Sequence, residues 1–462
     1  MIAQAIRWLF PDIARQELKK FGLLTFIFFL IIGSYWLVGL LKDTLFFKIA
    51  FPASLGWPEG YGRLMQPMAK FWSPFIVMVL ILVYSKLVDL VHRYQLFYIV
   101  CSFYAAIFTA IGGILAVRAL YGDIFIGKWL LAATGWLCFF ASDSFGSLMV
   151  VLFWSFTISI TDIQNAKKGF PLIIAGAQLG SIGGSAFTML AQRIGGIWPL
   201  FFVGSFFILC IIFMVAYFVR TIPGIYTTTN NIIPEQDKGF KGFVSGIKLL
   251  CTQPYFMGIF VISTFHEVVA SIVDYQMRSY VDTYPTFSGE LGFAYFQSLF
   301  GIAVNVAALF IALFGSRYVL KRYSITTCLL LVPCIFSIGL LILLLLLASG
   351  MSTPTFILWT TFTLMIVIKG LAYGFNNPTR DILYIPTSKD AQFKTKGFID
   401  SFGARMMLMG GAQVNNILKY NLHNLMLYGT LLSLGSIGVW LLAAVYVGRK
   451  NLQLIRQQKP LQ

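Results

Sequence analysis

Charged residues are scarce in this chain. They make up 11% of its 462 residues, whereas about a quarter of an ordinary soluble domain is charged. Acidic residues are the rarer kind, with 17 Asp and Glu against 34 Lys and Arg. Histidine occurs only three times, at His92, His266 and His423. Water is therefore not the main solvent of this protein.

Sequence patterns of hydrolysis and metal binding are also missing. The chain has no Walker-type glycine loop, and no Ser or Cys stands beside a pattern typical of a catalytic base. The six cysteines are scattered, without a CxxC pair or a histidine at ligand spacing. We therefore expect neither an enzyme nor a resident metal or cofactor.

Long apolar runs, by contrast, recur from Phe21 to Val447, and hydrophobic residues make up 58% of the chain. Lipid offers no partner to exposed backbone groups, so each run of bilayer-spanning length must be a helix. The sequence predicts an all-α membrane protein with twelve transmembrane helices. Their predicted ranges are 21–50, 66–85, 95–117, 129–161, 170–191, 197–219, 255–281, 292–315, 324–348, 355–386, 398–419 and 424–447.

The basic residues predict the orientation of these helices. If the N-terminal tail and every second loop lie in the cytoplasm, that side carries roughly three times as many Lys and Arg as the other, as the positive-inside rule requires. We therefore expect a protein of the cell inner membrane with both termini in the cytoplasm. The net charge of +17 is spread over many short loops and is not gathered into one domain. We therefore expect the lipid bilayer as a partner and no nucleic acid. We expect a monomer.

A polar stretch in the middle of the chain and a weak internal repeat indicate two halves. "AKKGF" ending at Phe170 matches "KTKGF" ending at Phe398, and "SKLVDLVHR" from Ser85 matches "SRYVLKRY" from Ser316, at offsets near half the chain length. Glycine pairs follow the first match in each half, at Gly183–Gly184 and Gly410–Gly411. The pattern predicts two six-helix halves of major-facilitator type. The predicted segments are an N-terminal cytoplasmic segment 1–20, a first half 21–219, a central cytoplasmic loop 220–254, a second half 255–447 and a cytoplasmic tail 448–462.

A set of charged residues falls well inside the predicted spans. A charge in the middle of a bilayer costs several kcal/mol, so such residues tend to face a wet cavity and to act there. They are Lys42 and Asp43 in the first span, Asp143 in the fourth, Asp274 and Arg278 in the seventh, Lys369, Arg380 and Asp381 in the tenth, and Asp400 and Arg405 in the eleventh.

These charges have a structural explanation as well as a functional one. They could pair with one another to tie helices together, or extend toward the membrane surface. Two of the pairs, Lys42 with Asp43 and Arg380 with Asp381, are adjacent in sequence and point about 100° apart on a helix. We therefore expect that neither pair simply neutralises itself, which favours partners elsewhere or a ligand.

Three segments resemble the nucleotide transporter family of ATP/ADP translocases from obligate intracellular bacteria and plastids. They are "KGLAYGFNNPTRDILYIPTSKD" from Lys369 to Asp390, "LFWSFTISITDIQNAKKGFPLIIAGAQLGS" from Leu152 to Ser181, and "LKD" from Leu41 to Asp43. The resemblance implies a carrier that exchanges ATP for ADP or moves other nucleotides.

The same resemblance implies four substrate-binding positions. Lys42 matches the family's first lysine, and Arg380 stands at its last lysine. Asp143 stands where the family has a glutamate before the apolar run of the fourth span. Asp274 is the best match, with a one-residue shift, to the glutamate of the seventh span. Both carboxylates and one of the two lysines are thus altered, which keeps the sign of the charge but changes the reach and hydrogen-bond geometry of the side chain.

The resulting hypothesis is an alternating-access carrier in which Lys42 and Arg380 hold the phosphates of a nucleotide from opposite halves of a cavity. Asp143 and Asp274 would orient those cations. Further candidates for the cavity are Asp43, Arg278, Lys369, Asp381 and Arg405. Two alternatives stay open, namely a carrier of another organic anion on the same fold and a membrane scaffold or sensor that transports nothing. The sequence does not choose between exchange and proton symport.

Overall fold

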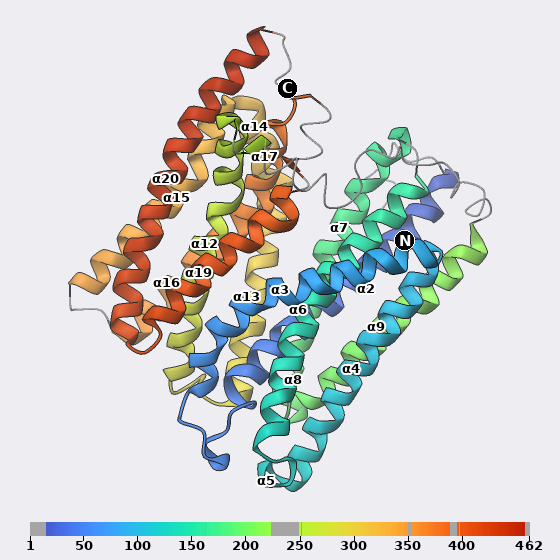
Figure 1. Ribbon diagram of the computed structural model, residues 1–462, viewed down its shortest axis with the longest axis vertical. Coiled ribbons are helices and arrows are strands. Elements are labelled where there is room, and N and C mark those ends of the chain that lie inside the picture. Colours follow the sequence, from blue (N-terminus) through green and yellow to red (C-terminus); the bar gives the residue numbers. More distant parts are fainter. Residues whose placement is uncertain are drawn as a thin grey trace. The chain divides into compact units, whose positions relative to one another are not determined.

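Figure 1 shows a computed structural model of the chain. The structure describes residues 15–161, 163–222, 249–250, 252–349, 353–388, 395–396 and 398–457. The predicted central loop 220–254 lies outside the described residues except for its two ends. The first part of the predicted segment 1–20 and the end of the predicted tail 448–462 lie outside them as well.

The chain forms two compact units. Unit 1 comprises Met1–Arg63, Phe75–Ile233 and Pro285–Asn305, and unit 2 comprises Leu64–Pro74, Pro234–Tyr284 and Val306–Gln462. Each unit therefore contains a short segment from the other half of the sequence. The predicted boundaries of the two halves stay a prediction.

The first half of the chain is a series of helices with short connections. Gly122 and Gly127 separate three of them, and both have φ above +80° (84° and 82°), a backbone conformation that suits glycine. The helices are α2 (Arg15–Lys48), the 3₁₀ turn η1 (Ala53–Leu55), α3 (Tyr61–Leu90), α4 (Arg93–Tyr121), α5 (Asp123–Ile126), α6 (Lys128–Ser159), α7 (Ile163–Thr188), α8 (Leu190–Ile194) and α9 (Trp198–Thr221).

The second half is also helical, but three of its helices contain or adjoin a π-helical turn. Polar caps begin two of the long helices, because the hydroxyls of Ser324 and Thr353 accept hydrogen bonds from backbone amides in the first turn. The elements are α12 (Pro254–Thr283), α13 (Glu290–Phe310), π-helix η2 (Ile311–Ser316), α14 (Arg317–Arg322), α15 (Ile325–Ala348), α16 (Pro354–Leu371), π-helix η3 (Ala372–Asn376), α17 (Asn377–Ile382), π-helix η4 (Ile399–Gly403), α19 (Ala404–Leu418) and α20 (Leu422–Gln457).

The predicted fold class is confirmed, since every regular element within the described ranges is a helix. Eleven helices of the described residues are long and apolar enough to cross a membrane. The predicted span 398–419 is not among them. It consists of η4 and the 15-residue α19, which carries polar residues such as Asn415 and Asn416. The predicted count of twelve transmembrane helices is therefore not confirmed, whereas the prediction of a multi-pass membrane protein is confirmed.

Helix packing follows the same pattern in both units. In unit 1, α2 packs against α6, α7 and α9, and α4 packs against α6 and α9. In unit 2, α12 packs against α16, α19 and α20, and α15 packs against α16 and α20. Figure 1 shows the first set in blue to green and the second in yellow to red. Each contact in one unit has its counterpart in the other, as a duplicated six-helix unit predicts.

The predicted glycine pairs lie at equivalent helix contacts. A Cβ on Gly184 of α7 would collide with the backbone of Gly33 in α2, and a Cβ on Gly411 of α19 would meet Val268 O at 2.8 Å in α12. A Cβ on the first glycine of each pair would meet almost nothing. The nearest atom to such a Cβ on Gly183 is Phe29 Cζ at 3.9 Å, and no atom lies within 4 Å of one on Gly410. In both units, the backbones of two helices therefore approach closely at the second glycine of the pair.

Candidate functional site

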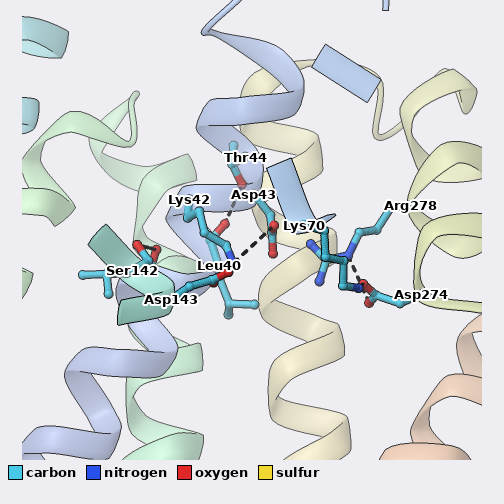
Figure 2. A network of polar contacts seen from close by, with 10 residues as sticks. Leu40, Lys42, Asp43, Thr44, Lys70, Ser142, Asp143, Asp274 and Arg278 are labelled. Carbon is cyan, nitrogen blue, oxygen red and sulfur yellow. Dashed lines mark hydrogen bonds and ion pairs between the residues drawn. The ribbon is translucent and has the colours of Figure 1, made fainter. Parts of the chain in front are cut away.

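Lys42 lies in unit 1 between two carboxylates. Its Nζ is 2.6 Å from Asp143 Oδ1, which comes from α6, and 4.0 Å from Asp43 Oδ1. The ammonium also lies 4.3 Å from the ring centre of Phe139. The pair joins α2 to α6 inside two candidate membrane spans (Figure 2). The nearest carboxylate to Lys42 is therefore on another helix, which agrees with the expectation that Lys42 and Asp43 do not simply neutralise one another.

Asp274 lies in unit 2 and bridges two cations (Figure 2). Arg278 Nε donates to its Oδ1 at 3.1 Å, and Lys70 Nζ of α3 donates to its Oδ2 at 3.3 Å. Arg278 follows Asp274 by four residues and therefore shares a face of α12. All three side chains are at most 14% exposed. Lys369 of α16 interacts electrostatically with Asp274.

Arg380 belongs to a third group of charges, also in unit 2. Its Nη1 is 3.1 Å from Asp400 Oδ1, and its Nη2 is 3.6 Å from Asp381 Oδ1. Asp381 also pairs with Lys396 at 2.9 Å. Arg380 and Asp381 come within ion-pair distance, but each has a nearer partner elsewhere, which agrees with the expectation that this pair does not simply neutralise itself. Asp381 is 48% exposed, so this pair is the weaker partner for Arg380.

The structure thus distributes the predicted residues over three groups. Lys42, Asp43 and Asp143 meet in unit 1, while Asp274 and Arg278 meet in unit 2 with Lys369 near them. Arg380, Asp381 and Asp400 form the third group. Arg405 lies half-buried in the first turn of α19.

Two charged residues of unit 2 escaped the sequence reading. Lys70 lies well inside α3 and Glu267 lies inside α12, but neither is among the candidate residues named from the sequence. The signal was present in both cases, because "QPMAKFWSPF" and "STFHEVVA" each place a charge within a span-length apolar run.

An ion-pair group at the end of α4 lies apart from these clusters. Arg118 Nε is 2.7 Å from Asp123 Oδ1, and its Nη1 is 3.1 Å from Glu290 Oε2 at the start of α13. Ser54 donates a further hydrogen bond to Asp123 at 2.6 Å. Partial burial raises the pKa of Asp123, but the hydrogen bonds from Ser54 and Arg118 outweigh it and hold that pKa below its usual value. These contacts tie α13 to the first half of the sequence within unit 1.

Comparison with known proteins bears on the meaning of these charges. The family model described as TLC ATP/ADP transporter matches residues 2–119 and 125–451. This chain belongs to the TLC ATP/ADP transporter family. The family resemblance predicted from the sequence is confirmed.

Individual members of the TLC ATP/ADP transporter family align with most of the chain. ADP,ATP carrier protein 1 of Chlamydia muridarum is 23% identical over 86% of this chain and 82% of its own length. ADP,ATP carrier protein 2, chloroplastic, of Arabidopsis thaliana is 24% identical over 92% of this chain and 74% of its own length. ADP,ATP carrier protein 1 of Rickettsia prowazekii is 21% identical over 89% and 88%.

Solved transporter structures share the fold of this family member. A peptide transporter POT in complex with sulfate has a TM-score of 0.61 at 13% identity and covers 95% of this chain and 94% of its own. A variant of the nucleoside transporter NupG has a TM-score of 0.55 at 15% identity and covers 94% and 98%. At such identities the likeness concerns the fold alone, and that fold is the predicted major-facilitator-like one.

Proposed function

We propose that this protein is an alternating-access carrier that exchanges nucleotides such as ATP and ADP across a membrane. Family membership and the ADP,ATP carriers among its relatives support the substrate class. The observation that carries the assignment of the site is the 2.6 Å pair of Lys42 with Asp143 inside two candidate spans. We place the protein in the cell inner membrane as a monomer, with both termini in the cytoplasm.

The carboxylates give Lys42 a partner when no substrate is bound. An isolated ammonium is costly in a medium of low dielectric constant, and Asp143 offsets that cost. Phosphate oxygens accept the same charge-assisted hydrogen bonds as a carboxylate. In the proposed cycle, a phosphate displaces Asp143 from Lys42 while substrate is bound, and Asp143 holds and orients the ammonium again when the substrate leaves.

Arg380 would act in the same way in unit 2. Its guanidinium presents two nitrogen atoms to Asp400 and Asp381 in the structure. Guanidinium groups bind phosphate through two parallel hydrogen bonds, which a lysine cannot do. We propose that phosphate takes the place of one of these carboxylates, while Asp274 balances the cations beside it.

Uptake of radiolabelled ATP into cells that express the protein tests this function. We expect saturable uptake that unlabelled nucleotides compete for, and loss of uptake in Lys42→Ala and in Arg380→Ala. The matched controls are Lys86→Ala and Arg220→Ala, since both side chains are exposed. Preloading with ADP should accelerate uptake, because exchange returns the loaded carrier faster than the empty one.

A different anion remains the second candidate, because the charged positions keep their sign but alter their reach. It predicts no uptake across the nucleotide panel but saturable uptake of another organic anion by well-folded protein. A scaffold without transport predicts that Lys42→Ala lowers stability while no ligand of either class raises the melting temperature of the wild type. Either result would rule out nucleotide exchange.

A further inference from the structure

Gln297 of α13 is a buried amide that forms no hydrogen bond. The residue is 0% exposed, and neither its Oε1 nor its Nε2 has a partner among the residues that the structure describes. Burial of a polar group without a hydrogen bond is costly, so such groups in folded proteins need an explanation, which is often a ligand or a water molecule. The surroundings of Gln297 indicate which partner the amide takes.

The contacts of α13 place Gln297 beside α2. Phe293 stacks on Phe47 of α2, with the ring centres 5.0 Å apart. A Cβ on Gly301 would lie 3.0 Å from Leu40 Cδ1, also of α2. Gln297 is four residues from both Phe293 and Gly301, so the three share a face of α13. That face lies along α2, and Gln297 is at the level halfway between the two contacts.

The stretch of α2 opposite Gln297 contains Lys42. Thr44 follows Leu40 by four residues and therefore shares the face of α2 that contacts α13. Lys42 precedes Thr44 by two residues, about 3 Å along the helix axis, and Figure 2 shows both residues on α2. The unpaired amide is therefore close in level to the ammonium that holds phosphate in the proposed function.

The backbone around Gln297 is held firmly in place. The hydroxyl of Ser298, the next residue, donates a hydrogen bond to Ser185 O of α7. A Cβ on Gly301 would lie 2.6 Å from Ser185 Oγ, so α13 approaches α7 closely at this glycine. A side chain on a helix that is fixed by its neighbours suits the recognition of a ligand with defined geometry.

An amide side chain pairs with a group that has a hydrogen-bond donor beside an acceptor. Its oxygen accepts one hydrogen bond while its nitrogen donates another. Adenine presents such a pair, the amino group N6 beside the ring nitrogen N7, and glutamine binds it through two hydrogen bonds. An ionised phosphate has acceptors only and would leave Oε1 unpaired. The chemistry of Gln297 therefore suits the base of a nucleotide better than its phosphates.

We propose that Gln297 binds the adenine base of the transported nucleotide, with Oε1 accepting from the amino group and Nε2 donating to the ring nitrogen beside it. The inference rests on the proposed function for the substrate class and adds the residue that sets the preference for a base. Lys42 holds the phosphates while Gln297 holds the base. The amide is fully buried in this structure, so the base reaches it in another state of the transport cycle.

The experiment compares ATP with purine riboside triphosphate as ligands of the purified protein in detergent, by thermal stabilisation over a range of concentrations. The two ligands carry the same phosphates, and the second lacks only the amino group of the base. We expect the wild type to bind ATP roughly ten-fold more tightly, as one well-formed pair with a base implies. Gln297→Leu should bind ATP as weakly as the wild type binds purine riboside triphosphate.

Two control variants separate base recognition from stability. Gln192→Leu, at an exposed position of α8, should match the wild type with both ligands. In Gln276→Leu a buried amide of α12 is lost whose Nε2 donates to Leu425 O at 2.9 Å, so this variant should melt earlier but keep its preference for ATP. Gln297→Leu loses no hydrogen bond within the described residues, so it should melt no earlier than the wild type.

The outcomes distinguish this inference from the proposed function. If Gln297→Leu keeps the preference for ATP, or if the wild type binds both ligands alike, the inference is wrong while nucleotide exchange stands wherever ATP uptake is intact. Gln297→Leu that melts as early as Gln276→Leu and still prefers ATP would identify a structural amide bonded to water, which also overturns the inference. If no nucleotide stabilises the protein or enters cells, the proposed function falls and base recognition falls with it.

Discussion

At the scale of single residues, two cations inside candidate membrane spans pair with carboxylates on other helices. Lys42 of α2 pairs with Asp143 of α6, and Lys70 of α3 pairs with Asp274 of α12. Replacing one member of a buried pair leaves an uncompensated charge, which costs more than the pair itself contributes. Of two carboxylates near one cation, the closer one is therefore expected to contribute more to the stability of the protein.

Asp143→Asn should destabilise the protein more than Asp43→Asn does. Asp143 Oδ1 lies 2.6 Å from Lys42 Nζ, whereas Asp43 Oδ1 lies 4.0 Å from it. Lys42 and Asp143 are partly exposed, so we expect Asp143→Asn to cost about 1–3 kcal/mol, at or below the range for a fully buried pair. Thermal melting in detergent measures it. A larger effect of Asp43→Asn would show that the pair with Asp143 is not the main one.

Sequence reasoning found the charged residues better than it found their partners. Lys42 and Asp143 were both predicted to be functional, but a separation of 101 residues hides the fact that they touch. Lys70 and Asp274 are 204 residues apart, and nothing local in either helix indicates the other. The rule that adjacent helical residues diverge was the more useful guide, because the shortest ion pairs of Lys42 and Arg380 are with Asp143 and Asp400 and not with their neighbours in sequence.

At the scale of helices, the sequence predicted most elements because the bilayer demands a fixed apolar length. The predicted span 255–281 corresponds to α12 (Pro254–Thr283), and 197–219 corresponds to α9 (Trp198–Thr221). The segment 398–419 was harder, since its polar residues shorten the apolar run and η4 interrupts the α-helix. The contact between α2 and α7 depends on glycines, whose role only the packing reveals.

Gly184→Ala should disrupt the contact of α7 with α2, while Gly183→Ala should be tolerated. A methyl group on Gly184 would collide with the backbone of Gly33, which cannot rotate away, whereas on Gly183 the nearest atom is Phe29 Cζ at 3.9 Å. Overpacking of this kind typically costs about 1–3 kcal/mol. The melting temperatures of the two variants in detergent test this prediction. Equal stability of both variants would mean that the helices lie further apart than described.

At the scale of the whole molecule, the two units have the same pattern of helix contacts but different charged residues. Both units repeat the same helix contacts and the same closely packed glycine. The charged residues of the two units differ, because unit 1 has the pair of Lys42 with Asp143, whereas unit 2 has Asp274 between Lys70 and Arg278.

The orientation in the membrane can be measured with single cysteines in a cysteine-free variant. Glu59, between η1 and α3, and Lys321, in α14, are both exposed. We expect a membrane-impermeant maleimide to label Glu59→Cys in intact spheroplasts and Lys321→Cys only after permeabilisation, because the basic loops stay in the cytoplasm. The reverse pattern would place both termini outside the cytoplasm.

The exchange of segments between the units has a consequence for biosynthesis. A ribosome delivers Lys70 to the membrane 204 residues before Asp274, and Arg118 172 residues before Glu290. Unit 1 is complete only when residues 285–305 have been synthesised, and unit 2 needs residues 64–74, which are inserted early. A nascent chain that stops in the central loop therefore holds an ammonium that still awaits its carboxylate, and membrane quality-control proteases can recognise it as unfinished.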